Sequence, residues 1–268
     1  MLVEGIAREP LVVDKDENIA RAFELLERKK DTHIVVSDEG KVTGILSVKD
    51  MLRIVLDRMR WGQQRVGKLY VSAVMTPNPI FVAPNIRVDK AARLMIEKGI
   101  SSLIVANSLD EVDEIKLITK RDFLQHWGDI FKGSEIVSDI MTRNPVVIHP
   151  GTSIKRAEWI LREKKISTLP VIEEGMLSGY VDARLLALYI VRVYLKGDIK
   201  HFDVFLNETT VSDIMKPPHY VLETEPIESA VEKMLRKKAK GTPVLAGDKL
   251  TGIVTETDLT KLLAGEKI

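Results

Sequence analysis

The chain has 268 residues, of which 45% are hydrophobic and 29% are charged, and its net charge at pH 7 is +1. This composition is typical of a soluble globular protein, and the small net charge argues against a nucleic-acid or anionic-membrane partner. The absence of cysteine excludes disulfides, thiolate metal ligands and a cysteine nucleophile. No apolar run reaches the roughly 18 residues of a membrane span, and the start lacks the pattern of a signal peptide. We therefore expect a cytoplasmic protein, and the scarcity of glutamine beside abundant Lys, Glu and Arg favours a thermophilic source.

Four copies of one unit follow each other along the chain. Each copy starts near a proline, and a short β-rich run comes after it; the prolines are Pro10, Pro79, Pro145 and Pro218. Further on, the spacing of apolar residues predicts an amphipathic helix, which begins at Ile19, Val88, Ile154 and Ile227. Two short strands joined by a tight turn are predicted next, as at 33–36 and 42–46, and a second helix follows them.

The predicted unit is therefore strand–helix–strand–strand–helix, and the predicted fold class is α/β (α+β). One unit is too small to bury both faces of its sheet, so we expect the repeats to pair in space. We place the boundary between two pairs near residue 131, because the connection at 123–138 is short and carries two glycines. The first module would be 1–130, with repeats at about 1–60 and 70–130. The second would be 131–268, with repeats at about 135–195 and 208–268.

A polar motif recurs where the last strand of a unit runs into its second helix. Three copies keep a Ser or Thr followed three residues later by Asp, and these pairs are Ser47 and Asp50, Thr119 and Asp122, and Thr255 and Asp258. A helix N-terminus suits phosphate, the hydroxyl can add a hydrogen bond, and the carboxylate is placed to accept both ribose hydroxyls. The apolar residue before each motif would form a wall for a purine, and these residues are Ile45, Leu117 and Ile253.

The same motif is also a capping box, which stabilises a helix by about 0.5–2 kcal/mol without any ligand. The two roles are compatible, because a ligand can bind beside a cap. The third repeat carries Asp182 and Leu185 at the two motif positions. Since Leu185 cannot bind a ribose and Asp182 would repel a phosphate, we expect this site to be empty or to bind an atypical ligand. Lys116 replaces the usual glycine in the second repeat and leaves that site usable.

The ordered set of these elements resembles CBS domains, the cystathionine-β-synthase-type repeats, in two tandem pairs called Bateman modules. The resemblance rests on 74–79, 139–145 and 166–171 together with the Ser/Thr-x-x-Asp motifs, and it covers nearly the whole chain. A chain of four such repeats is similar to the γ subunit of AMP-activated protein kinase and to its archaeal stand-alone relatives. The resemblance implies AMP, ADP or ATP as ligand, no covalent cofactor, and a homodimer or a disc-shaped packing of modules.

Phosphate contacts are expected from basic residues in and near the motifs. Lys49, Lys120 and Arg121 lie inside the motifs, and the family pattern implies that His33 and Lys240 face the cleft from strand starts. We favour Arg121, because a guanidinium can hold a phosphate with two hydrogen bonds.

The sequence gives no pattern for catalysis or for a metal site. The five histidines lack metal-ligand spacing, and nucleophile-elbow, P-loop and dinucleotide-binding patterns are all missing from the sequence. We therefore expect a non-enzymatic regulatory protein that acts on an unknown partner, such as a kinase or a metabolic enzyme. The aromatic and basic connection at 186–210 is the predicted surface for that partner or for a homodimer. The alternatives are a sensor of S-adenosylmethionine or another adenosyl metabolite, and a ligand-free structural module.

Overall fold

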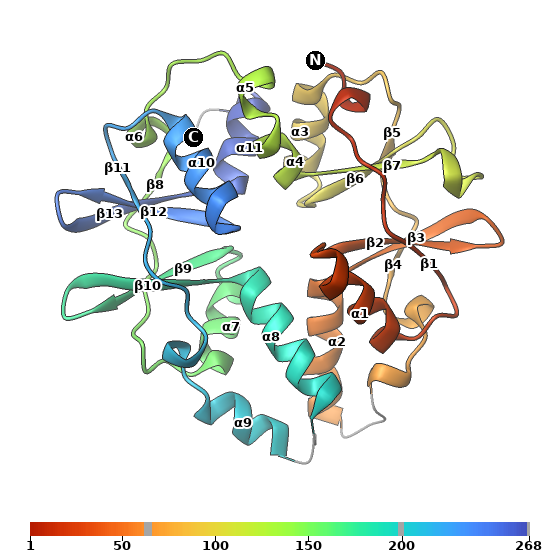
Figure 1. Ribbon diagram of the computed structural model, residues 1–268, viewed down its shortest axis with the longest axis horizontal. Helices are drawn as coiled ribbons and strands as arrows, with labels where there is room; N and C mark the ends of the chain where they lie inside the picture. Colours follow the sequence, from red (N-terminus) through yellow and green to blue (C-terminus); the bar gives the residue numbers. More distant parts are fainter. Residues whose placement is uncertain (62–65, 198–200, 267–268) are drawn as a thin grey trace.

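The computed structural model describes residues 1–61, 66–197 and 201–266, with only the backbone of 58–61. Four repeats lie as the quadrants of a disc in Figure 1. The first repeat consists of β1 (Val12–Asp14), α1 (Ile19–Lys29), β2 (His33–Asp38), β3 (Lys41–Ser47) and α2 (Val48–Trp61). The second consists of β5 (Phe81–Val82), α3 (Val88–Glu97), β6 (Ser102–Val105), β7 (Lys116–Thr119) and α4 (Lys120–Gln125).

The other two repeats have the same order of elements. The third consists of α7 (Ile154–Glu163), β9 (Thr168–Glu173), β10 (Met176–Asp182) and α8 (Ala183–Lys196), and its first strand is reduced to a bridge between Ile148 and Val171. The fourth consists of β11 (Val221–Leu222), α10 (Ile227–Lys237), β12 (Gly241–Ala246), β13 (Lys249–Thr255) and α11 (Glu256–Leu263). The predicted mixed α/β fold of four repeated units is confirmed.

Short elements fill the connections between the repeats. They are the α-helices α5 (Trp127–Ile130), α6 (Val137–Ile140) and α9 (Phe202–Glu208), and the 3-10 helices Val3–Gly5, Val66–Lys68, Val71–Ala73, Val112–Glu114 and Val211–Asp213. Within the described ranges, no helix is long and apolar enough to cross a membrane.

The first helix of each repeat packs by the apolar face that the sequence predicts. In α1 the residues Ile19, Ala22, Phe23 and Leu26 are all buried, and α10 buries four residues at the same spacing. Because these residues recur every three or four positions, they form one stripe that faces the sheet. The helix periodicity of the sequence is thus confirmed by burial.

Neighbouring repeats exchange the edges of their sheets. The strand β4 (Thr76–Pro77) leads into the second repeat but pairs with β3 of the first. The strand β8 (Thr142–Arg143) leads into the third repeat but pairs with β13 of the fourth. Single bridges, Arg8 to Leu117 and Lys216 to Tyr180, complete the exchange in the opposite direction. Repeats one and two therefore share sheets, as do three and four, which supports our proposal of two modules, 1–130 and 131–268.

In three of the four repeats, a glycine lies three residues before the first motif position. It leaves space for a methionine that comes directly before the segment paired with this strand. A Cβ added at Gly44, Gly179 or Gly252 would collide with the sulfur of a methionine, and these methionines are Met75, Met215 and Met141. The second repeat has Lys116 at this position, and the residue before the paired Arg8 is Ala7. A lysine is therefore tolerated there because the facing side chain is small.

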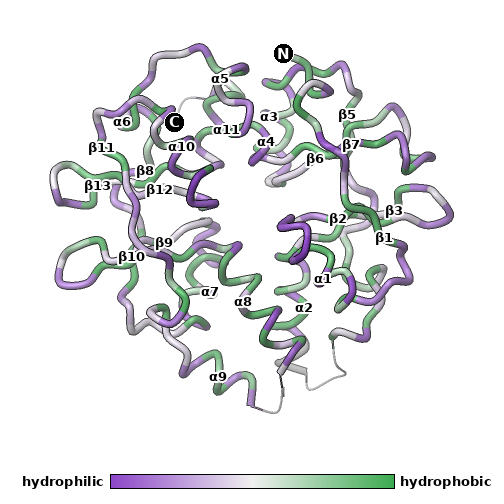
Figure 2. The backbone as a smooth tube through the Cα atoms, viewed as in Figure 1, coloured by the Kyte–Doolittle hydropathy of each residue, from purple (hydrophilic) through white to green (hydrophobic). Residues whose placement is uncertain are grey.

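The two halves of the disc meet through helices. Helix α2 packs against α8, and α3 packs against α11; Arg93 Nη2 donates to the carbonyl of Ala264 at 3.0 Å across the second contact. Figure 2 shows long hydrophobic stretches in α8, the helix that faces α2. One core cluster accordingly contains buried residues of both helices, among them Met51 and Ile190. Three of these four helices, α2, α8 and α11, begin at the motif position of their repeat, so the motif helices contribute to the contacts between the modules.

The aromatic residues of the predicted partner surface at 186–210 belong largely to the core. Tyr194 and Phe202 are 6% and 4% exposed and pack edge to face, with ring centroids 5.1 Å apart. Residues 198–200 lie outside the described residues. These two rings therefore join α8 to α9, and the use of 186–210 as a partner or homodimer surface stays a prediction.

Candidate functional site

Each intact motif forms a capping box at the start of its helix. The Oδ2 atom of Asp50 accepts from the backbone N of Ser47 at 2.9 Å and from its Oγ at 2.6 Å. The corresponding distances are 2.6 and 2.7 Å at Asp122, and 2.8 and 2.7 Å at Asp258. The cap uses one carboxylate oxygen in every copy, and the second oxygen, Oδ1, takes no part in it. Capping and ribose binding can therefore coexist on one aspartate.

Two of the three motifs open into a central cavity of about 1610 Å³ that all four repeats line. The predicted site residues along it are Ile45, Ser47, Asp50, Ile253, Thr255 and Asp258, together with His33, Lys49 and Lys120. The remaining predicted residues are Leu117, Thr119, Asp122, Arg121 and Lys240, and they are not among the residues that line it. We call the clefts at Asp50 and Asp258 the open clefts.

The two open clefts are built alike. Thr76, Asn78, Pro79 and Ile80 line the cavity beside the first, and Thr142, Asn144, Pro145 and Val146 line it beside the second. Asn78 and Asn144 both have a left-handed backbone, with φ of 51° and 50°. These segments carry part of the resemblance to CBS domains, but the motifs alone did not identify them as residues of the site. Asn78 and Asn144 each come directly before the proline that starts a repeat, and this shared position was the signal that could have identified them.

Arg8 closes the cleft at Asp122. Its guanidinium binds Asp31 through two hydrogen bonds of 2.6 and 3.0 Å, and its Nε lies 3.3 Å from Oδ1 of Asp122. Burial raises the pKa of Asp122 against the opposing hydrogen bond of Thr119 and the charge of Arg8. The oxygen that a ribose would need is therefore already engaged. At Asp50 the comparable contact, with Arg53 at 3.6 Å, is a weak pair because Arg53 is 65% exposed.

The cleft of the third repeat is closed by a different arrangement. Asp182 caps its helix by accepting from Leu185 N at 2.7 Å, and it also accepts from Lys240 N at 3.2 Å. Burial raises the pKa of Asp182. Tyr180, at the position of the purine wall, packs edge to face against His219, and both are buried. Protein side chains thus fill this position, and our expectation about its ligand stays a prediction.

Arg121 and Lys240 have structural partners. Arg121 donates to the carbonyls of Met234, Leu235 and Ala239 at the end of α10, at 2.9–3.1 Å. Both cations also contact the buried Glu256, Lys240 at 2.7 Å and Arg121 at 3.4 Å. Arg121, which we favoured as the phosphate ligand, therefore joins α4 to the C-terminal end of α10.

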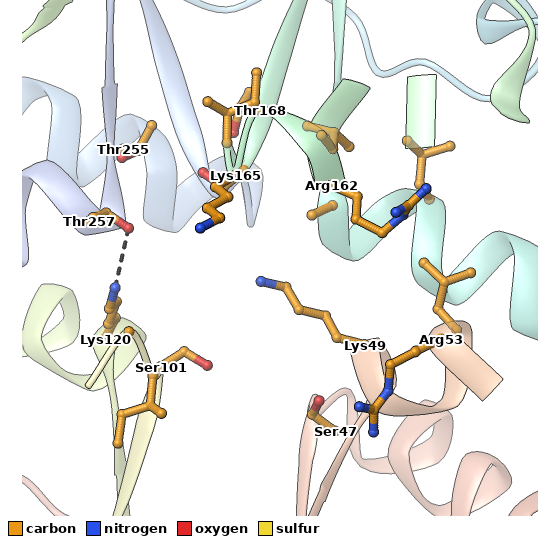
Figure 3. A pocket seen from close by; sticks show the side chains of 18 of the residues that line it. Ser47, Lys49, Arg53, Ser101, Lys120, Arg162, Lys165, Thr168, Thr255 and Thr257 are labelled. Carbon is orange, nitrogen blue, oxygen red and sulfur yellow. Dashed lines mark hydrogen bonds between the residues drawn. The ribbon is translucent and has the colours of Figure 1, made fainter. Parts of the chain in front are cut away.

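Three lysines extend into the central cavity, as Figure 3 shows for Lys49, Lys120 and Lys165. Lys120 donates to Thr257 Oγ1 at 3.2 Å, and desolvation together with the charges of Lys49 and Lys240 lowers its pKa to about 8. Burial and the charge of Lys240 also lower the pKa of Lys49. Lys165, at the end of α7, was missed because no motif marks it. The cavity is therefore a place where negative charge would be stabilised.

His33 is a neutral hydrogen-bonding residue at the edge of the cavity. Its ring nitrogens lie 3.0 Å from Thr32 Oγ1 and 3.2 Å from Ser101 Oγ. Burial, with a contribution from Lys240, lowers its pKa to about 3. His33 therefore carries no charge for a phosphate at neutral pH. In the described residues, no group of three or more His, Asp or Glu could hold a metal ion.

Comparisons with known proteins place this chain in a family. Two solved structures share its fold along 98% of this chain and 100% of their own. They are protein MJ1225 of Methanocaldococcus jannaschii, described as a candidate archaeal homologue of γ-AMPK (TM-score 0.82, 22% identity), and an uncharacterised conserved protein of Pyrococcus horikoshii (TM-score 0.66, 21% identity). By sequence, MJ1225 is 23% identical over 247 residues, which are 86% of each chain.

Inosine-5′-monophosphate dehydrogenase of Korarchaeum cryptofilum is 30% identical over 198 residues, 68% of this chain but only 39% of the enzyme. The family model of the CBS domain matches four segments, 3–57, 71–128, 137–192 and 211–265, which together make up most of the chain. The chain belongs to the CBS domain family.

Proposed function

We propose that this protein is a non-enzymatic regulator that binds adenosine nucleotides in its two open clefts. One observation supports this most directly. The motif aspartates Asp50 and Asp258 line one cavity together with cationic side chains from several repeats. The chain belongs to the CBS domain family. The resemblance to this family implies adenosine ligands, and it therefore supports the same proposal.

The proposed contacts follow from the geometry of each open cleft. The ribose hydroxyls donate to Oδ1 of Asp50 or Asp258, whose Oδ2 is used by the cap. The adenine lies against Ile45 or Ile253, both of which line the cavity. The phosphates face the N-terminal end of α2 or α11, where backbone N–H groups favour anions. The lysines of the cavity stabilise the remaining charge.

The cavity lysines favour a nucleotide over S-adenosylmethionine as the ligand. Lys49 and Lys165 form no ion pair within the described part of the chain, and Lys120 is hydrogen-bonded to a neutral hydroxyl. S-adenosylmethionine is itself cationic at its sulfonium and has no phosphate, so these lysines would repel it. Phosphate groups would neutralise them.

Regulation would come from the helices that begin at the open clefts. Helix α2 starts at Val48 and packs against α8 of the other half of the disc, and α11 packs against α3 in the same way. A ligand at a helix N-terminus that favours one arrangement of these contacts shifts the population towards it. The shift would alter a surface that a protein partner binds.

The test is calorimetric titration with AMP, ADP, ATP and S-adenosylmethionine. We expect two nucleotide sites per chain. Asp50→Ala and Asp258→Ala should each weaken one site about a hundredfold, because hydrogen bonds to a charged group are lost. Asp122→Ala should leave both sites unchanged.

Asp213→Ala is the matched control for the cap. Asp213 accepts from Thr210 N and Oγ1 at 2.7 and 2.9 Å, the same capping geometry, but it does not line the cavity. The proposal is wrong if no nucleotide binds, or if the Asp50 and Asp258 variants change stability alone, as Asp213→Ala should.

A further inference from the structure

Two positions recur in every repeat and border the cleft of the other repeat in its module. The first lies on the sheet edge that the repeats exchange, where it pairs antiparallel with the residue at the purine wall. These pairs are Arg8 with Leu117, Thr76 with Ile45, Thr142 with Ile253, and Lys216 with Tyr180. The last motif position follows the wall residue by five residues in every repeat. The edge residue, which we call the edge position, therefore has the same register to that motif position in all four clefts.

The second position lies directly after the first helix of the repeat. Each first helix is followed closely by a residue with a left-handed backbone, and the backbone N of the next residue donates to a carbonyl in the last turn of the helix. We call this next residue the helix-end position. In chain order it is Asp31, Ile100, Ile166 and Ala239. The shared hydrogen bond makes these four residues structurally equivalent.

In the first repeat the two positions carry a charged pair. The guanidinium of Arg8 donates two hydrogen bonds to Asp31, at 2.6 and 3.0 Å, and its Nε lies 3.3 Å from Oδ1 of Asp122. Oδ1 of Asp31 also accepts from the backbone N of Thr32 at 2.7 Å, which fixes this carboxylate. The side chains of Asp31 and Asp122 are 13% and 4% exposed. Arg8 is therefore held over Asp122 in a contact that is largely shielded from water.

The open clefts have neutral side chains at the same two positions. Both positions line the cavity there, as Thr76 and Ile100 from the second repeat and as Thr142 and Ile166 from the third. A threonine carries no charge and an isoleucine has no hydrogen-bonding group, so these side chains cannot form an ion pair over the motif aspartate. The fourth repeat has Lys216 and Ala239, but the third cleft that they border has Leu185 in place of the aspartate.

Resting on the proposed function, we propose that the edge position and the helix-end position determine whether a cleft admits its nucleotide. Arg8 and Asp31 form a two-residue plug, in which Arg8 engages the ribose oxygen of Asp122 and Asp31 is the positioning residue that holds the guanidinium there. Both residues belong to one repeat, so the same pair placed on the second or third repeat should close an open cleft. The exchange adds one positive and one negative charge, so the net charge of the cavity stays the same.

The experiment is calorimetric titration of the full chain with AMP. Thr76→Arg combined with Ile100→Asp should weaken the site that depends on Asp50 by about a hundredfold or more, and leave the site at Asp258 within about twofold of the parent. Thr142→Arg combined with Ile166→Asp should do the reverse. The site that remains also shows that each double variant is folded.

The reverse exchange and a matched control complete the set. Arg8→Thr combined with Asp31→Ile should add a third site, which Asp122→Ala removes again. Lys216→Thr changes a cation at the edge position beside a cleft whose motif lacks the aspartate. This control should leave both the number of sites and their affinities unchanged.

A second measurement detects the plug without any ligand. In a double-mutant cycle of thermal unfolding, Thr76→Arg combined with Ile100→Asp should have a Tm about 2–4 °C above the value obtained by adding the two single changes. The reason is that the new guanidinium and carboxylate bind each other only when both are present.

The outcomes separate this inference from the proposed function. If the parent binds two AMP and the Thr76→Arg, Ile100→Asp variant keeps both sites with Asp50 still required, the plug is overturned and nucleotide binding stands. Purely additive Tm changes also overturn it, because a loss of binding would then have another cause. If the parent binds no nucleotide at all, both proposals fall.

Discussion

The open clefts at Asp50 and Asp258 and the closed clefts at Asp122 and Asp182 lie at the same position of the repeat, where the last strand runs into the second helix, yet they differ in what faces that helix start. In an open cleft the motif aspartate lines the central cavity. At Asp122 the guanidinium of Arg8 lies at 3.3 Å from Oδ1 of the aspartate, and in the third repeat Tyr180 and His219 fill the space. The helix start therefore specifies a cap, and the residues around it, which include Arg8 and His219 from the other repeat of each pair, decide whether a ligand can reach it.

The largest expected effect on binding comes from removing Arg8. Arg8→Ala frees Oδ1 of Asp122, so a third nucleotide site should appear in calorimetric titration. The same change leaves Asp31 and Asp122 without their cation, and the free energy of unfolding should fall by about 1–3 kcal/mol. Arg8→Lys keeps a cation beside Asp122 and should keep two sites. Two sites in both variants would show that Arg8 does not close this cleft.

A second comparison sets Arg121 against Lys49, which occupy the same motif position in a closed and an open cleft. Arg121→Ala should lower the free energy of unfolding by about 2–4 kcal/mol, because three carbonyls lose their donor and the buried Glu256 loses one of its two cationic partners. Its effect on nucleotide affinity should be small. Lys49→Met should do the reverse, with weaker ATP binding and stability within about 0.5 kcal/mol of the parent. Urea unfolding and titration of both variants measure this, and a loss of ATP binding in Arg121→Ala alone would reverse our assignment.

The fold could be predicted from the sequence because its signals are local and repeated. Apolar spacing, turn prolines and the Ser/Thr-x-x-Asp motif recur at nearly constant offsets, so each copy supports the others. The state of each cleft could be predicted only where the motif itself changes, as at Leu185. Arg8 lies far in sequence from Asp122 and belongs to no motif, so its role needed three-dimensional contacts. Lys165 likewise reaches the cavity from the end of α7, where a basic residue normally faces solvent.

A third comparison concerns the residue before the purine wall. Gly252 precedes Ile253 in an open cleft, and a Cβ there would collide with Met141 and crowd the carbonyl of Thr142. Gly252→Ala should therefore lower the free energy of unfolding by about 1–3 kcal/mol. Lys116 precedes Leu117 in a closed cleft opposite the smaller Ala7, and Lys116→Ala should cost within about 0.5 kcal/mol. Thermal unfolding compares the two, and equal losses would contradict the role we assign to the methionine.

The smallest effect, per pH unit, is the response of the closed third cleft to acid. Burial lowers the pKa of His219 from 6.5 to about 4, so the folded state binds a proton less readily than the unfolded state. Above pH 6.5 the imidazole is neutral in both states, and His219 does not reduce the free energy of unfolding. Between pH 6.5 and 4 the unfolded state binds the proton first, so the free energy of unfolding falls by about 1.4 kcal/mol per pH unit. His219→Phe keeps a ring against Tyr180 and should flatten this slope. His33, whose pKa is lowered to about 3, titrates alike in both proteins, so the difference between their urea-unfolding curves at pH 7.5 and 5 isolates His219. Equal slopes would mean that the imidazole can gain a proton without opening the closed cleft.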